Sequence, residues 1–112
     1  MQKQRLIIVG ARAQHGLSRD VENYETRVAR TCSEARLLLA DSPAPSYILT
    51  DISLPDGNWC DVLRLAVHLE VPADVQVLGR DCTPSFQLEV AARGGRCVPS
   101  FELRPTATRG AA

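Results

Sequence analysis

The sequence predicts an α/β fold in which five parallel strands form one doubly wound sheet, with helices on both faces. Three observations indicate it. Short, continuous apolar runs have the form of buried strands, segments with helical spacing lie between them, and proline or glycine residues mark the boundaries. Strands that alternate with helices are typical of a parallel sheet. For five strands the common order is 2-1-3-4-5, with right-handed crossovers.

Length and composition limit the class of protein. The chain has 112 residues, which fits one domain, and its hydrophobic content of 45% is enough for a core. Thirteen basic residues balance thirteen acidic ones, so we expect no direct binding to nucleic acid. The apolar run at residues 6–9 is too short for a membrane span or a signal peptide. We therefore expect a cytoplasmic protein that does not contact a membrane.

Five strands are expected, at residues 5–9, 25–31, 47–50, 75–78 and 97–98. The first and third, RLIIV and YILT, are continuous apolar runs, which indicates burial on both faces of the sheet. The second has arginines on one side and Val28 near its centre, as a charged edge strand does. The third strand ends at Asp51.

Four helices are expected between these strands. The first is carried by Leu17, Val21 and Tyr24 and follows a loop over residues 10–16. The second begins with capping-box spacing at residues 31–34 and ends at the prolines of residues 42–45. After a loop at residues 53–58, the third has its apolar face at residues 62–69. The fourth begins with Thr83 as N-cap, has apolar side chains at residues 86, 90 and 91, and ends at a glycine pair, residues 94–95.

The four cysteines do not form a metal or redox motif in the sequence. Cys32, Cys60, Cys82 and Cys97 are 28, 22 and 15 residues apart, without a C-x-x-C pair. Neither a zinc site nor a thioredoxin-type motif is therefore predicted. In a cytosolic protein we expect them to be reduced and mostly buried, and a redox or regulatory thiol is the alternative.

The sheet order also predicts where a ligand would bind. In a doubly wound sheet of order 2-1-3-4-5 the crevice lies at the carboxyl ends of strands 1 and 3. Gly10 and Ala11 follow the first of these strands, and Asp51 ends the other. Asp51 is therefore the candidate functional carboxylate.

Residues 47–57, YILTDISLPDG, resemble the phosphoacceptor segment of bacterial response-regulator receiver domains, the CheY-like family. In that family an apolar strand ends in Asp, followed by x-x-[ML]-P and a turn that contains glycine. The resemblance covers residues 5–101 and implies a flavodoxin-like fold. It also implies a stand-alone module of a two-component or phosphorelay system. Asp51 matches the phosphoacceptor and Pro55 the loop proline, and a histidine kinase or phosphotransfer protein would be the partner.

The chain departs from the receiver pattern at four places. Receivers end the first strand with two acidic residues that hold Mg²⁺, where this chain has Gly10 and Ala11. The hydroxyl residue that ends the fourth strand corresponds to Gly79. A lysine ends the fifth strand in receivers, but Lys3 is the only lysine of this chain. The switch aromatic corresponds to Val98 or a neighbour.

These departures weaken the expected metal site. Mg²⁺ needs hard oxygen ligands in near-octahedral geometry, and Asp51 by itself would bind it weakly. Asp56, in the turn that follows, is read as a solvated acid or as a stand-in ligand. Arg96 or Arg104 could reach the crevice, although arginine is not an equal replacement for lysine. No cofactor is therefore predicted with certainty.

The last receiver helix is expected to be short or missing, because eleven residues follow Phe101 and they include Pro105 and Gly110. We expect a receiver-like domain at residues 1–103 and a disordered tail at residues 104–112. One face of the sheet would then be partly uncovered. A homodimer partner or another protein would cover it.

Two function classes stay open. One is a receiver that is switched at Asp51. The other is a pseudo-receiver, a binding module that works without phosphorylation. An enzyme is not expected, because residues 10–16 contain no glycine-rich phosphate loop.

Trp59 is either part of the core or an anchor at the rim of the site, and His15 and His68 are expected at the surface.

Overall fold

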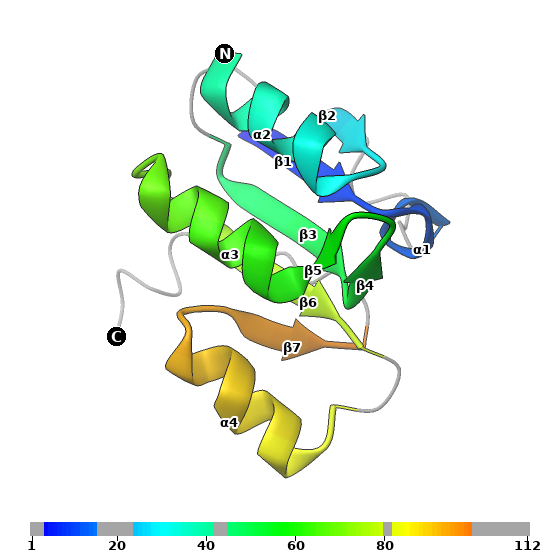
Figure 1. The fold of residues 1–112 in the computed structure, drawn as a ribbon, viewed down its shortest axis with the longest axis vertical. Helices are drawn as coiled ribbons and strands as arrows, with labels where there is room; N and C mark the ends of the chain where they lie inside the picture. The colour runs from blue at the N-terminus through cyan, green and yellow to red at the C-terminus, as the bar shows by residue number, and fades with distance from the viewer. Residues whose placement is uncertain (1–3, 16–23, 42–44, 80–81, 100–112) are drawn as a thin grey trace.

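The computed structural model describes residues 4–15, 24–41, 45–79 and 82–99, and its centre is one parallel sheet (Figure 1). The strand order is β2-β1-β3-β6-β7, and each neighbouring pair is parallel. This confirms the predicted order, because β6 and β7 are the fourth and fifth strands of the sheet. The sheet strands are β1 (Gln4–Val9), β2 (Tyr24–Ala29), β3 (Tyr47–Asp51), β6 (Asp74–Leu78) and β7 (Arg96–Val98).

Four helices and a small hairpin complete the described fold. The hairpin pairs β4 with β5 in antiparallel orientation and lies between β3 and the third helix. The bounds of these elements are α1 (Ala11–His15), α2 (Cys32–Asp41), β4 (Ser53–Leu54), β5 (Gly57–Asn58), α3 (Trp59–His68) and α4 (Pro84–Ala92). Among the described residues, no helix is long and apolar enough to cross a membrane.

The sheet separates two groups of buried apolar side chains. Because side chains alternate across a strand, Ile7 and Val9 face one group and Leu6 and Ile8 the other. The larger group includes residues from α2, α3 and α4, which form one helical layer in Figure 1. The smaller group includes Ala13 of α1. Helices therefore cover both faces, as the doubly wound fold requires.

The start of the chain differs from the expectation. Residues 10–16 were predicted as a loop, but α1 begins directly after Gly10. Tyr24 was predicted in a helix and is the first residue of β2, paired with Gln4. The prediction was wrong there because a thin apolar spacing does not outweigh pairing with a buried neighbouring strand. Leu17 and Val21 lie outside the described residues.

Two further expectations need correction. Residues 53–58 form a hairpin instead of an irregular loop, with Leu54 opposite Gly57. The sheet face that was expected to lack cover is buried at the described residues: Leu6 and Leu49 are 0% exposed and Tyr47 is 3% exposed. The expected exposed apolar patch on this face is therefore not present at these side chains. The proposed tail at residues 104–112 lies outside the described residues.

Candidate functional site

Asp51 lies at the predicted crevice and is nearly inaccessible to solvent. It is the last residue of β3, pairs with Leu78 of β6, and is 7% exposed. The preceding Thr50 is 0% exposed and donates its hydroxyl hydrogen bond to the Asp51 carbonyl oxygen at 3.1 Å. The carboxylate is thus held at the carboxyl end of the sheet.

Both oxygens of the Asp51 carboxylate accept hydrogen bonds from the backbone of α1. The Arg12 N–H donates to Oδ2 at 3.0 Å, and the Ala13 N–H donates to Oδ1 at 2.7 Å. The first amides of a helix have no partner within the helix, and a side chain at the N-cap commonly accepts from them. Gly10 precedes α1 and has no side chain, so Asp51 supplies this acceptor from another strand. The negative carboxylate is also favourable at the positive end of the helix.

Gly10 makes this arrangement possible in two ways. Its φ of +109° lies in the region that glycine adopts at little cost. A Cβ on residue 10 would overlap the Asp51 carboxylate, and it would lie 2.8 Å from the Asp51 Cβ. The backbone is further held by the Gly10 N–H, which donates to the Ala29 carbonyl oxygen at 2.8 Å. The space that a side chain at residue 10 would fill is therefore occupied by Asp51.

The residues at this edge do not fit a Mg²⁺ site. Gly10 and Ala11 have no side-chain oxygen, and both Asp51 oxygens already accept amide hydrogens. Mg²⁺ requires several hard oxygen ligands at once. Within residues 4–15, 24–41, 45–79 and 82–99, no group of three or more His, Cys, Asp or Glu side chains gathers to hold a metal ion. We derive no chemistry through a metal here.

Asp56 lies in the hairpin turn after Pro55 and binds a different helix. Its carboxylate accepts from the Cys32 N–H at 2.7 Å and from the Ser33 N–H and Oγ, both at 3.1 Å. These hydrogen bonds, the Cys32 amide first, lower the pKa of Asp56 from its ordinary value. Pro55 and Asp56 are both exposed. The solvated turn acid is therefore an N-terminal cap of α2, 23 and 24 residues away in the sequence.

The predicted N-cap of α4 is confirmed, and the predicted capping at residues 31–34 is present at Thr31, whose Oγ1 accepts from the Glu34 N–H at 3.1 Å. The cap of α3 was not predicted: Asp61 accepts from the Asn58 N–H at 3.0 Å, while the Asn58 side chain accepts from the Cys60 N–H, so α3 begins with a capping box. Thr83 Oγ1 accepts from the Phe86 N–H at 3.2 Å at the start of α4. Together with Asp51 and Asp56, these groups give all four described helices a side-chain acceptor near their first turn.

A hollow of about 560 Å³ lies between α2 and α3. Its walls include Asp56 and Asp61 and the basic side chains Arg36, Arg64 and His68. Cys32 also lines it, and burial together with the nearby Asp56 raises the pKa of this thiol to about 11. Cys32 is therefore a protonated, weakly nucleophilic thiol at neutral pH.

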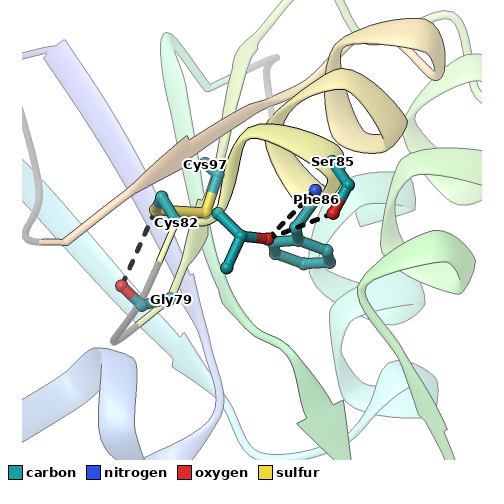
Figure 2. Close-up of a disulfide and its surroundings, with 6 residues drawn as sticks. Gly79, Cys82, Ser85, Phe86 and Cys97 are labelled. Atoms are coloured by element: carbon teal, nitrogen blue, oxygen red, sulfur yellow. Dashed lines mark hydrogen bonds between the residues drawn. A yellow bond between two sulfur atoms is a disulfide. The ribbon is translucent and has the colours of Figure 1, made fainter.

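Gly79 follows β6 and borders a disulfide, which corrects the prediction for two cysteines. Cys82 and Cys97 are bonded, with their Cα atoms 6.0 Å apart (Figure 2). A Cβ on residue 79 would lie 2.9 Å from Cys97 Sγ and 3.6 Å from Cys82 Sγ. The prediction failed because the pairing depends on the sheet, which brings β7 beside the end of β6. Cys32 and Cys60 are free, as predicted.

Three other candidate residues can be placed. Arg96 pairs with Asp74 at 2.8 Å, and both are at the start of their strands, so Arg96 lies at the sheet end opposite Asp51. The expectation that it reaches the crevice is wrong. Trp59 is 5% exposed and packs edge-to-face on Phe86, with ring centroids 5.6 Å apart, which favours the core reading. His68 is exposed, as expected; the side chain of His15 and residues 80, 81 and 104 lie outside the described part.

Sequence reasoning missed the amides of Arg12 and Ala13 and the disulfide. A helix start that would expose the Arg12 and Ala13 amides had a weak signal in the sequence, since Gly10 follows a buried strand and precedes residues with helical propensity. The disulfide had none, because a spacing of 15 residues does not distinguish a disulfide from two separate thiols.

The fold is that of receiver domains. The structure is similar to the receiver domain of the Francisella response regulator 1452, with a TM-score of 0.72 and 16% identity over 88% of this chain and 87% of that one. It is also similar to the chemotaxis response regulator CheY4 of Vibrio cholerae, with a TM-score of 0.69 and 17% identity over 98% and 96% of the chains.

A third similar structure is a response regulator from Burkholderia pseudomallei with a phosphorylated aspartic acid, a calcium ion and citrate. Its TM-score is 0.70, with 19% identity over 97% of this chain and 71% of that one. No protein-family profile matches the sequence, and a comparison with curated proteins finds no significant relative. The similarity is therefore one of fold.

Proposed function

We propose that the chain is a receiver-like signalling module that acts through protein–protein contacts, and that Asp51 is a structural carboxylate in it. The receiver fold supports the coarse role, because the similar structures are receiver domains of response regulators. The observation that carries the finer role is the contact of both Asp51 oxygens with the Arg12 and Ala13 amides above Gly10.

The chemistry of phosphoryl transfer explains why this contact matters. A carboxylate oxygen that accepts a hydrogen bond is a weaker nucleophile and is held in place, and nearby cations must offset the charge of the phosphoryl oxygens. Here each oxygen of Asp51 accepts a backbone hydrogen bond, Gly10 and Ala11 carry no metal ligand, and position 79 has no hydroxyl. The module in this proposal is a cytoplasmic, non-enzymatic binding protein, a pseudo-receiver whose surface is read by a partner protein.

The alternative is a receiver that a histidine kinase or phosphotransfer protein phosphorylates at Asp51. Its support is the position of Asp51 at the carboxyl end of β3, the strand next to β1, where a doubly wound sheet commonly binds its ligand. A homodimer through the sheet face of Leu6 and Leu49 is not part of either proposal, since those side chains are buried within the chain.

Incubation with an acyl phosphate and millimolar Mg²⁺, followed by intact-mass measurement, tests the proposal. We expect no phosphoryl adduct, and no shift of the melting temperature with Mg²⁺. A phosphorylatable receiver in the same buffer is the positive control, and Asp56→Asn is the matched variant. An adduct that is present in the wild type and Asp56→Asn but lost in Asp51→Asn would overturn the structural role and support the alternative.

A further inference from the structure

The Cys82–Cys97 disulfide encloses α4, a helix that buries few of its side chains. The two cysteines are 15 residues apart, and all of α4 lies between them. Of the nine residues of α4, Val90 alone is buried, and Leu88 is 73% exposed. Phe86 is half-buried against Trp59. Apolar contacts therefore hold this helix weakly, so the covalent bond matters more here than it would for α3.

The strand on the other side of the bond is equally short of contacts. β7 has three residues and lies at the edge of the sheet, where its only strand neighbour among the described residues is β6. Cys97 is the central residue of β7 and pairs with Val77 of β6. The disulfide thus joins the segment that precedes α4 to the edge strand that follows it, and holds helix and strand together as one unit.

Neither cysteine of the disulfide is fully buried. Cys82 and Cys97 are both half-buried residues, and Cys97 packs against the larger core group. Cys82 Sγ lies 3.8 Å from the Gly79 carbonyl oxygen, dashed in Figure 2. A disulfide sulfur carries no hydrogen, so this contact becomes a weak hydrogen bond only when Cys82 is a thiol. The reduced form therefore has an acceptor ready for its new donor.

The bond also occupies a particular place in the fold. The absence of a side chain at Gly79 leaves the space in which Cys97 Sγ lies, since a Cβ there would be 2.9 Å from this sulfur. The Gly79 N–H donates to the Val98 carbonyl oxygen at 2.9 Å, which ties the end of β6 to β7. The disulfide therefore lies at the carboxyl end of the sheet, the same end at which Asp51 pairs with Leu78.

We propose that Cys82 and Cys97 form a reversible redox modification site, which a dithiol reduces, and that its state determines how firmly α4 and β7 are held. This inference goes beyond the proposed function and does not depend on whether Asp51 is phosphorylated. Cys32 and Cys60 are not part of the site: both are free thiols in the structure, and the Cys32 thiol stays protonated at neutral pH.

The reaction is a two-electron thiol–disulfide exchange. A thiolate of the dithiol attacks one sulfur of the Cys82–Cys97 bond, which breaks and leaves a mixed disulfide and one cysteine thiolate that takes up a proton. The second thiol of the reductant then displaces the other cysteine, which is also protonated. The protein gains two electrons and two protons, and the dithiol becomes a cyclic disulfide.

The size of the effect follows from the loop that the bond closes. A disulfide around a loop of about 15 residues lowers the population of open states by roughly a hundredfold. We therefore expect amide hydrogen exchange in α4 and β7 of the full chain to become roughly a hundredfold faster when dithiothreitol reduces it, with little change in β1 and β3. Oxidised glutathione should restore the slow exchange.

Thiol labelling in denaturant shows which state is present. Without reductant we expect two labelled cysteines, Cys32 and Cys60, and after reduction all four. A Cys32→Ser/Cys60→Ser variant should respond to reduction as the wild type does, while Cys82→Ser/Cys97→Ser should exchange fast in both conditions. If the Cys82→Ser/Cys97→Ser variant does not fold, the comparison of hydrogen exchange in the oxidised and the reduced wild type tests the proposal by itself.

Three results would overturn the proposal. Four labelled cysteines without reductant would show that the bond does not form. Equal exchange in α4 before and after reduction would show that the bond does not hold the helix. Failure of dithiothreitol to reduce the folded protein would show that the site is not reversible.

Discussion

Asp51 and Asp56 do the same chemical task in two different surroundings. Each carboxylate accepts from two consecutive amides at the start of a helix that is distant in the sequence: Asp51 binds α1, and Asp56 binds α2. Asp51 is 7% exposed and stands above a glycine with positive φ, whereas Asp56 is exposed in a hairpin turn.

The difference shows that a carboxylate's contribution to stability depends on its burial and not only on the number of hydrogen bonds it accepts. If an exposed cap is removed, water can bind the freed amides. If a buried cap is removed, the amides lose their partner and remain desolvated. The two aspartates should therefore differ in how much stability they contribute, and the following variants test that difference.

Gly10→Ala should have the largest effect. The new Cβ would overlap the Asp51 carboxylate and force residue 10 out of its φ of +109°, so we expect a loss of about 3 kcal/mol in the free energy of unfolding. Urea titration measures it. Gly94→Ala is the matched control, because Gly94 has a φ of +94° and a Cβ there meets nothing within 4 Å. Equal losses in the two variants would show that the close approach of Asp51 to Gly10 does not matter.

Asp51→Ala should cost about 2 kcal/mol, since the amide of Ala13 is buried and that of Arg12 is partly buried. The same titration measures it. Removal of the carboxylate also makes room at residue 10, so the double variant Gly10→Ala/Asp51→Ala should lose less stability than the two single losses added together. Strict additivity would contradict the proposed packing of Asp51 over Gly10.

Asp56→Asn should cause the smallest loss of stability at neutral pH, and this loss should decrease as the pH falls. The pKa of Asp56 lies below its ordinary value of 3.8, so the folded state is stabilised above that pH. This stability is lost as the pH falls through the lower, folded-state pKa. Thermal unfolding between pH 5 and pH 2 should therefore show the wild type and Asp56→Asn converging. A constant difference across this range would exclude the Asp56 carboxylate as its source.

Much of the fold could be predicted from local patterns. The apolar runs around Ile7 and Ile48, and the caps at Thr31 and Thr83, depend on residues that are close in the sequence. Each pattern therefore predicts its own element. The thin spacing at Leu17, Val21 and Tyr24 was misleading because Tyr24 pairs with β1, a contact that the helical spacing does not reflect.

The candidate site was predictable in place but not in geometry. Because strand order determines which carboxyl ends meet, Asp51, Gly10 and Gly79 could be assigned to one edge of the sheet. The partners of Asp51 could not, because backbone amides are common to nearly all residues and only their position in space makes them donors. Arg96 was misplaced for a related reason: its register with Gln76 puts it beside Asp74, at the other end.

The α/β class, the strand order and the lack of the acidic pair, the hydroxyl and the lysine at the receiver positions could all be predicted from the residues alone. These depend on residue identity and on periodicity, which are local properties. The cap that Asp51 forms on α1 and the bond between Cys82 and Cys97 are visible in the folded chain and not in its sequence. Both contacts join segments brought together by sheet register, which depends on the simultaneous burial of many side chains.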